Sequence, residues 1–129
     1  MFTSDAFARL FRARDALREM ADPPLSIRSV ARDAGMSPFH FIRRFQAMFG
    51  ETPHQVRIRS RLDCAKQLLA LSDRSVTDVC LDVGFTSLGS FSDLFARRVG
   101  LPPSAYRRQV RSMMQAPGAI HKRYLFATN

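Results

Sequence analysis

The sequence predicts an all-α fold of about seven helices, in which two similar units are joined by a long helix. Three observations support this prediction. Apolar residues recur at helical spacing along most of the chain. Segment 25–53 is echoed by segment 74–103. Glycine or proline stands at most points where a helix is expected to end. With 129 residues, 46% of them hydrophobic, the chain is long enough to bury a core.

The first expected helix covers residues 5–21. It ends at Asp22-Pro23-Pro24, because proline cannot continue a helix. Its arginines, Arg9, Arg12, Arg14 and Arg18, more often form a solvated face than a phosphate contact. The large apolar residues expected on its buried stripe are Phe7, Leu10, Phe11 and Leu17.

Segments 25–53 and 74–103 are two copies of one unit, which differ by one extra residue in the second copy. The matched pairs are Ile27 and Val76, Val30 and Val79, Asp33 and Asp82, Gly35 and Gly84, Phe41 and Phe91, Phe45 and Phe95, Gly50 and Gly100, and Pro53 and Pro103. Each copy is expected to form a short helix, a glycine turn and a second, amphipathic helix. This is the helix-turn-helix pattern, and two copies in register support it more strongly than one.

Serines flank the expected helices of each copy. Ser26 and Ser75 are suitable N-caps of the short helices, because a hydroxyl can accept hydrogen bonds from the free N–H groups of a first turn. Gly35 and Gly84 can adopt the left-handed conformation that ends a helix. Ser37, and Thr86 or Ser87, can then cap the second helices, which are expected at about 38–49 and 87–99.

A long helix over 53–71 is expected to connect the two copies, with Pro53 at its first position. At 1.5 Å per residue this helix is roughly 28 Å long. A last short helix is expected over 103–111, with Tyr106 inward and Arg107, Arg108 and Arg111 near the surface. The predicted organisation is 1–52 (first helix and first helix-turn-helix), 53–72 (linker helix), 73–112 (second helix-turn-helix and last helix) and 113–129 (tail).

The charge of the chain points to a polyanionic partner. The net charge is +9 and the pI about 11.2, and Lys66 and Lys122 are the only lysines. Arginine offers a planar fork of donors that suits phosphate oxygens and guanine edges. A nucleic acid is therefore the simplest expected partner, with a membrane surface as the lesser alternative. The two helix-turn-helix patterns make double-stranded DNA the expected nucleic acid. No apolar run approaches the roughly 20 residues of a membrane span, and no secretion signal is recognisable.

Catalytic and metal-binding patterns are missing from the sequence. His40, His54 and His121 are scattered, no phosphate-binding glycine loop is present, and no effector pocket is suggested. Cys64 and Cys80 lie inside helical patterns, as small buried hydrophobes in a reducing cytosol would. We therefore expect neither an enzyme nor a bound metal or cofactor.

Three segments carry a family resemblance: VARDAGMSPFHFIRRFQAMFGETP, RSRLDCAKQLL and VCLDVGFTSLGSFSDLFARRVGLPPSAYRR, of which the last is the most specific. Through these segments the sequence resembles the AraC/XylS family of bacterial transcription regulators, over about residues 5–111. This resemblance implies two helix-turn-helix subdomains joined by a long helix. It also implies that the positions of Phe39, Ile42 and Arg43 read bases, and that RNA polymerase is recruited or blocked.

The exposed face of the 38–49 helix is the expected base reader of the first unit. Residues three and four apart share a helix face, which places Phe39, Ile42, Arg43 and Gln46 opposite the phenylalanines. Arg43 can bind guanine O6 and N7, and Gln46 can address adenine, while Phe39 and Ile42 can pack on thymine methyls. Phe39 can instead be a satellite of the core. The expected phosphate contacts are Ser37, His40 and Arg44, although His40 suits a framework role equally well.

The second unit departs from this pattern. Gly89 and Asp93 occupy the places of Phe39 and Arg43, and a carboxylate is repelled by phosphate. Asp93 can accept a hydrogen bond from cytosine or pair with Arg97. Leu88 is the one expected base contact in this unit. Thr86, Ser87, Ser90 and Arg97 are expected at phosphates. The inner side of this helix or its edges should hold Phe91, Leu94, Phe95, Arg98 and Val99.

The expected mode of action is binding to DNA as a monomer. Successive major-groove faces lie about 34 Å apart on one side of the duplex, so two tandem readers can serve a monomer on DNA. The linker helix carries three possible phosphate contacts, Arg57, Arg59 and Arg61. Arg61 is equally suited to a structural ion pair. Because no ligand-sensing domain is recognisable, we expect the activity of the protein to be set by its abundance. We expect it to act in the cytoplasm, on the nucleoid. The alternatives are a nonspecific architectural DNA-binding protein and a protein-interaction module acting through the tail, MMQAPGAIHKRYLFATN.

Overall fold

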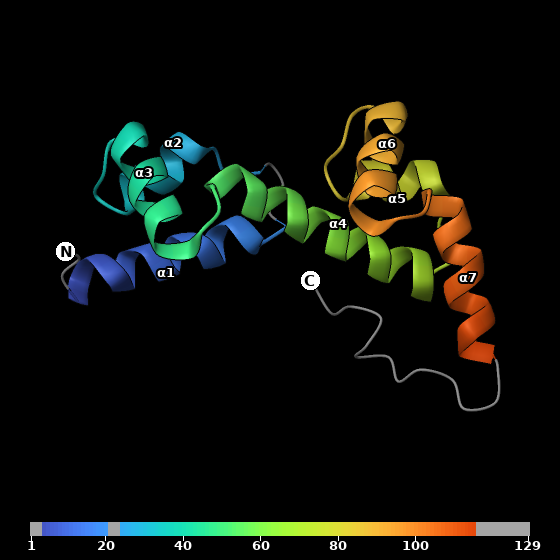
Figure 1. The fold of residues 1–129 in the computed structure, drawn as a ribbon. Helices are drawn as coiled ribbons and strands as arrows, with labels where there is room; N and C mark the ends of the chain where they lie inside the picture. The colour runs from blue at the N-terminus through green and yellow to red at the C-terminus, as the bar shows by residue number, and fades with distance from the viewer. Residues whose placement is uncertain (1–3, 21–23, 116–129) are drawn as a thin grey trace. The chain divides into compact units, whose positions relative to one another are not determined.

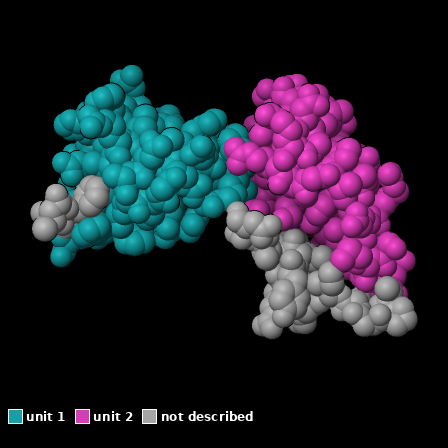
Figure 2. Space-filling model, in the orientation of Figure 1, with its two compact units in different colours: residues 1–61 teal, residues 62–129 magenta. Residues whose placement is uncertain are grey.

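A computed structural model describes residues 4–20 and 24–115 of the chain, and these residues form seven helices and no strand (Figure 1). The helices are α1 (Ser4–Arg18), α2 (Ile27–Asp33), α3 (Pro38–Phe49), α4 (Pro53–Leu71), α5 (Val76–Asp82), α6 (Leu88–Val99) and α7 (Pro103–Gln115). The all-α prediction is confirmed. The chain divides into two compact units, 1–61 and 62–129, and the boundary lies within α4 (Figure 2).

Two helix boundaries differ from the prediction. Helix α1 ends at Arg18 rather than at residue 21, and a tight turn follows in which the Glu19 N–H donates to the Ala16 carbonyl at 3.3 Å. Helix α7 continues to Gln115 rather than ending at 111, because neither glycine nor proline interrupts residues 112–115. Met113 and Met114, expected in the tail, therefore belong to α7 and are half-buried. The rest of the expected tail, 116–129, lies outside the described residues.

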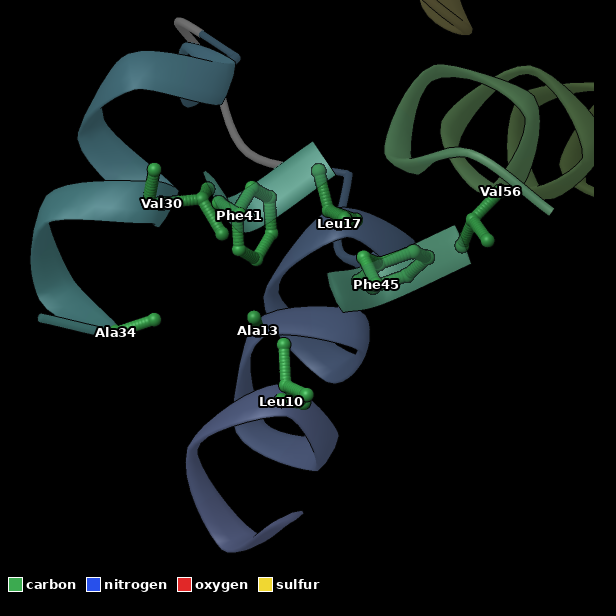
Figure 3. Packing of buried hydrophobic residues seen from close by; sticks show 9 residues of the cluster. Leu10, Ala13, Leu17, Val30, Ala34, Phe41, Phe45 and Val56 are labelled. Carbon is green, nitrogen blue, oxygen red and sulfur yellow. The ribbon is translucent and has the colours of Figure 1, made fainter. Parts of the chain in front are cut away.

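The core of unit 1 is built from four helices (Figure 3). Phe41 and Phe45 are fully buried on one side of α3, and Met48 and Phe49 pack against the same cluster. The predicted stripe of α1 is partly wrong, because Phe7 and Phe11 remain 39% and 44% exposed. Phe11 lies edge-on against Phe49 at the rim, with ring centroids 5.5 Å apart. The buried residues that the rest of the unit contributes to this cluster are Leu10, Ala13 and Leu17 of α1, Val30 and Ala31 of α2, Ala34 directly after α2, and Val56 of α4.

A chain of aromatic rings organises the core of unit 2. Phe91 and Phe95, the counterparts of Phe41 and Phe45, are fully buried, with ring centroids 5.8 Å apart. Phe85 of the turn contacts Phe91 at 5.2 Å, and Tyr106 of α7 lies edge-on against Phe95 at 5.4 Å. The two units therefore bury the second helix of each motif in the same way. Cys80 is buried and Cys64 half-buried, and burial raises the pKa of both thiols.

The turn between α2 and α3 depends on Gly35, which has a φ of +72°. A Cβ at this position would lie 2.7 Å from Nη1 of Arg9, the atom that donates to the Ala34 carbonyl at 3.3 Å. Gly50 ends α3 with a similar φ of +75°, but a Cβ there would meet nothing within 4 Å.

These two glycines form a matched pair for mutation. Gly50→Ala is expected to cost about 1 kcal/mol of unfolding free energy, from left-handed backbone strain alone. Gly35→Ala should cost roughly 0.5–1 kcal/mol more, because Arg9 must leave its carbonyl acceptor. Urea denaturation of both variants measures the difference. Equal losses would show that the contact with Arg9 contributes nothing to the turn.

Candidate nucleic-acid interface

The sequence sets the start and end of α3 locally. The Ser37 hydroxyl accepts a hydrogen bond from the His40 N–H at 3.3 Å, and Pro38 occupies the first turn, where its missing N–H is not needed. The left-handed Gly50 ends the helix. Because Phe41 and Phe45 are buried in the core, the opposite face of α3 is held outward.

The four predicted base-reading residues share this outward face of α3. Phe39 is 65% exposed, and Ile42, Arg43 and Gln46 are also exposed. Arg43 extends back over Phe39, and its guanidinium carbon lies 5.5 Å from the centre of the ring. His40 and Arg44, predicted at phosphates, are exposed beside this face. The structure therefore brings together aromatic, aliphatic, cationic and amide side chains within about two turns of helix.

The start of α6 repeats that of α3, but its exposed face differs. Ser87 rather than Thr86 is the N-cap, and its hydroxyl accepts from the Ser90 N–H at 3.2 Å. Within the described part of the chain, Asp93 and Arg97 do not form the ion pair that their spacing allowed. The residues exposed at the turn and on α6 include Thr86, Ser87, Leu88, Gly89, Ser90, Asp93 and Arg97.

Arg98 lies further out than expected. The sequence placed it on the inner side of α6 or its edge, whereas the side chain is exposed. A long arginine side chain at the margin of a buried face can direct its charged end into water. Unit 2 thus exposes two neighbouring cations, Arg97 and Arg98, in the last turn of α6.

Two of the arginines considered for surface or phosphate roles instead bind the backbone at matching positions of the two units. Arg57, the fifth residue of α4, donates to the carbonyl of Leu25, just before the N-cap Ser26. Arg107, the fifth residue of α7, donates to the carbonyl of Arg74, just before the N-cap Ser75. Arg107 also donates to the carbonyls of Leu69 at 3.0 Å and Ser72 at 3.4 Å, near the end of α4. Burial lowers the pKa of both guanidinium groups.

Other arginines are held by carboxylates. Arg59 pairs with Glu51 at 2.6 Å, and Arg111 pairs with Asp73 at 3.2 Å. Arg9 pairs with Asp5, and the pKa of this carboxyl group is lowered by its hydrogen bond to Arg9. Arg74 pairs with Asp82, which raises the pKa of the Arg74 guanidinium. These contacts separate structural arginines from those, such as Arg43 and Arg97, that have no oxygen partner among the described residues.

Sequence reasoning missed two features that carried a recognisable signal. The Arg57 and Arg107 contacts follow from the matched segments PHQVR and PSAYR, which place an arginine four residues after each helix-starting proline. The N-terminus of α4 carries a reciprocal capping box, in which the Thr52 N–H donates to the Gln55 side chain at 2.8 Å and the Gln55 N–H donates to the Thr52 hydroxyl at 3.2 Å. The Thr-x-x-Gln spacing predicts this arrangement.

The described residues form a pocket that is small for a ligand, and no metal site. This pocket, of about 220 Å³, lies in unit 1. Its lining comes from α1, including Arg12, from α2, including Asp33, and from Ala34 directly after α2. It is smaller than the roughly 300–1,000 Å³ usual for ligand pockets. No group of three His, Cys, Asp or Glu residues in the described ranges could hold a metal ion. None of the described helices combines the length and the apolar character that crossing a bilayer requires.

Comparison with known proteins agrees with this geometry. A family model described as a helix-turn-helix domain matches residues 30–109. The MmsAB operon regulatory protein of Pseudomonas aeruginosa is 40% identical over 95 residues, which make up 74% of this chain and 31% of that protein. The chain spans only 31–37% of the length of the first four curated relatives.

Solved structures give the same result. The DNA-binding domain of AdpA, a global transcriptional factor in complex with a target DNA, is 32% identical with a TM-score of 0.68, over 85% of this chain and 96% of that one. A transcriptional regulator from Chromobacterium violaceum, described as of the AraC type, is 26% identical with a TM-score of 0.73, over 83% and 96%. The two-unit helical fold, the matched family model and these relatives together show that the chain belongs to the AraC/XylS family of helix-turn-helix DNA-binding transcription regulators.

Proposed function

We propose that the chain binds double-stranded DNA sequence-specifically and that α3 is its principal base-reading helix. The observation that carries this proposal is the outward face of α3, on which Arg43 and three further residues stand opposite a fully buried pair of phenylalanines. A helix of this kind fits the major groove of B-DNA. Because the buried side is anchored in the core, the same side chains face the groove in every binding event.

Binding begins with the phosphates. The net charge of +9 attracts DNA and releases its counterions. Ser37, His40 and Arg44 lie beside the reading face of α3, where they can contact the backbone on either side of the groove. The Ser37 oxygen already accepts a backbone hydrogen bond, so its remaining O–H can donate to a phosphate.

Base selection follows from the chemistry of the reading face. The Arg43 guanidinium can donate two hydrogen bonds to O6 and N7 of one guanine. The Gln46 amide can donate from its nitrogen to N7 of adenine and accept at its oxygen from the adenine N6 amino group. Ile42 offers a methyl surface to thymine. Phe39 lies at the rim of the same face, where it can contact a thymine methyl or a sugar.

Unit 2 has a positioning role in this scheme. Asp93 stands where Arg43 stands in unit 1, and its exposed carboxylate opposes the phosphate field. Leu88 is the residue of this unit that can touch a thymine methyl. Thr86, Ser87, Ser90 and Arg97 surround the start and the outer face of α6, where they can hold phosphates. Sequence selection therefore rests mainly on unit 1.

The proposed function includes an effect of DNA binding on transcription. Two helix-turn-helix motifs on one chain allow a monomer to occupy an asymmetric site, in the cytoplasm and on the nucleoid. A relative from Escherichia coli, 31% identical, is named a transcriptional activator. Recruitment of RNA polymerase is accordingly the proposed outcome of binding, with no catalytic step by this chain. We also propose that residues 53–72 link the two helix-turn-helix units.

Selection from a random duplex library tests the proposal, with the wild-type chain, Arg43→Ala and Arg97→Ala compared. The wild-type chain is expected to select a motif that contains guanine. Arg43→Ala should lose about 1–3 kcal/mol of discrimination at one guanine position, since one bidentate contact disappears. Arg97→Ala should instead weaken all sequences alike and lower the salt dependence by about one phosphate contact. Absence of any motif would support an architectural role, and an unchanged motif with Arg43→Ala would exclude Arg43 as a reader.

A further inference from the structure

The exposed aromatic ring of Phe39 has no packing role that explains it. It is 65% exposed, although the other phenylalanines of α3 are buried or half-buried. Among the described residues, its ring and cation partners both lie on α3: the His40 ring, with centroids 6.3 Å apart, and the Arg43 guanidinium, 5.5 Å from the ring centre. A cation within about 6 Å of an aromatic ring centre is attracted by the negative face of the ring.

Arg43 is held differently from the arginines that bind oxygen atoms within the fold. Arg14 also contacts rings, lying 5.0 Å from the centre of Phe11 and 4.5 Å from that of Phe49, but it is half-buried, whereas Arg43 is exposed. Arg9, Arg57 and Arg107 donate N–H groups to carbonyl oxygens, and Arg59 and Arg74 donate to carboxylates. Such partners occupy the donors that a base would need. For Arg43, no oxygen partner is present among the described residues, and the ring interacts with the cation while leaving its in-plane N–H groups available.

Phe39 and Arg43 occur together in unit 1, and unit 2 has neither residue at the matching positions. Unit 1 has Phe39 and Arg43 four residues apart, one helical turn along α3. Unit 2 has Gly89 and Asp93 at the matching positions, so the ring and the guanidinium are both replaced. An aromatic residue that served only to contact thymine would not require the arginine beside it.

We propose that Phe39 is a positioning residue for Arg43, whose ring holds the guanidinium in the orientation that reads guanine. The inference rests on the proposed function and specifies how the site discriminates. A long arginine side chain loses rotamer freedom when it binds, and a partner that orders it beforehand reduces this loss. The ring therefore acts on guanine through Arg43, in addition to any contact of its own.

A double-mutant cycle tests the inference on the duplex recovered by selection. Binding is measured to this duplex and to one with 7-deazaguanine at the guanine assigned to Arg43, since this base lacks the N7 acceptor. Phe39→Leu removes the π face but keeps an apolar side chain, and Phe39→Trp keeps a π face. Phe39→Leu is expected to lower the guanine to 7-deazaguanine affinity ratio about two- to fivefold. Phe39→Trp should retain the ratio, and Phe39→Leu should not change it in an Arg43→Ala background.

The outcomes separate this inference from the function on which it rests. A uniform loss of affinity for both duplexes, equal in both backgrounds, would overturn the positioning role and assign Phe39 a direct DNA contact. An unchanged ratio with Phe39→Leu, combined with a collapsed ratio with Arg43→Ala, would overturn the inference and leave the function standing. An unchanged ratio with Arg43→Ala itself would overturn both. Circular dichroism provides the folding control, because Phe39 lies outside the core and its variants should keep wild-type helicity.

Discussion

Phe45→Ala is expected to lower the free energy of unfolding of unit 1 by about 3–5 kcal/mol, the range for truncating a buried phenylalanine. The Phe45 side chain is fully buried, and its ring lies 5.5 Å from that of Phe41 and 4.6 Å from that of Phe49. Truncation leaves a cavity under the middle of α3. Since small domains are stable by only about 5–15 kcal/mol, this loss removes a large part of the total.

The consequence for function follows from the position of Phe45 on α3. The residue lies opposite Arg43, so loss of its anchoring frees the reading face to tilt or fray. Selection of a DNA motif by Phe45→Ala is therefore expected to fail even though every DNA-facing side chain is present. Nonspecific binding should persist, because it depends on the charge of the chain.

Hydrogen exchange resolved along the chain is the appropriate measurement for Phe45→Ala. Two compact units need not unfold together, so a single melting curve would not assign the loss. Amides of α3 should exchange much faster, and those of α6 should keep their protection. Phe39→Ala is the matched control, the same substitution on the exposed side of the same helix, and should change exchange little. Equal effects of the two variants would contradict the assignment of the core.

The arrangement of the helices was predictable because it follows from local signals. Ser37 and Gly50 mark the ends of α3 through hydrogen bonding and backbone conformation, which depend on neighbouring residues only. The spacing of Phe41 and Phe45 then determines which face is buried, and hence that Arg43 is exposed. The internal repeat added a second test of each assignment, because an incorrect period would not recur in register.

The incorrect predictions concern residues whose burial or hydrogen bonding depends on partners far away in the sequence. Phe11 fits an apolar stripe, yet the limited width of the α1 contact buries Ala13 and leaves Phe11 at the rim. By sequence, Arg57 is a possible phosphate contact. The match between PHQVR and PSAYR marks its position as equivalent to that of Arg107, but it does not reveal that the carbonyl of Leu25, 32 residues earlier, lies within reach. Side chains as long as arginine can bind oxygen atoms on several elements, and periodicity cannot choose among them.

Arg107→Ala is expected to lower the free energy of unfolding of unit 2 by about 1.5–3 kcal/mol, the range for hydrogen bonds made by a charged group. The half-buried Arg107 guanidinium donates to the carbonyls of Leu69, Ser72 and Arg74. These carbonyls belong to the last turn of α4 and to the segment that leads into α5. Because the last carbonyls of a helix have no partner within it, removal of Arg107 leaves the Leu69 carbonyl to compete for water at a partly buried site. The Arg74 carbonyl also loses the Arg107 donor, whereas the Ser72 carbonyl still accepts from Arg111.

Two variants at and beside this position separate geometry from charge. Arg107→Lys keeps the charge but presents a single ammonium group in place of a planar fork, so it should recover less than half of the lost stability. Arg108→Ala removes the adjacent, exposed arginine, which has no hydrogen-bond partner among the described residues, and should change the stability little. The diagnostic result is faster exchange of α5 and α6 amides in Arg107→Ala with α3 unaffected. Full recovery by lysine would instead mean that position 107 contributes through its charge rather than through the three carbonyls, and the matching contact of Arg57 with Leu25 would need the same revision.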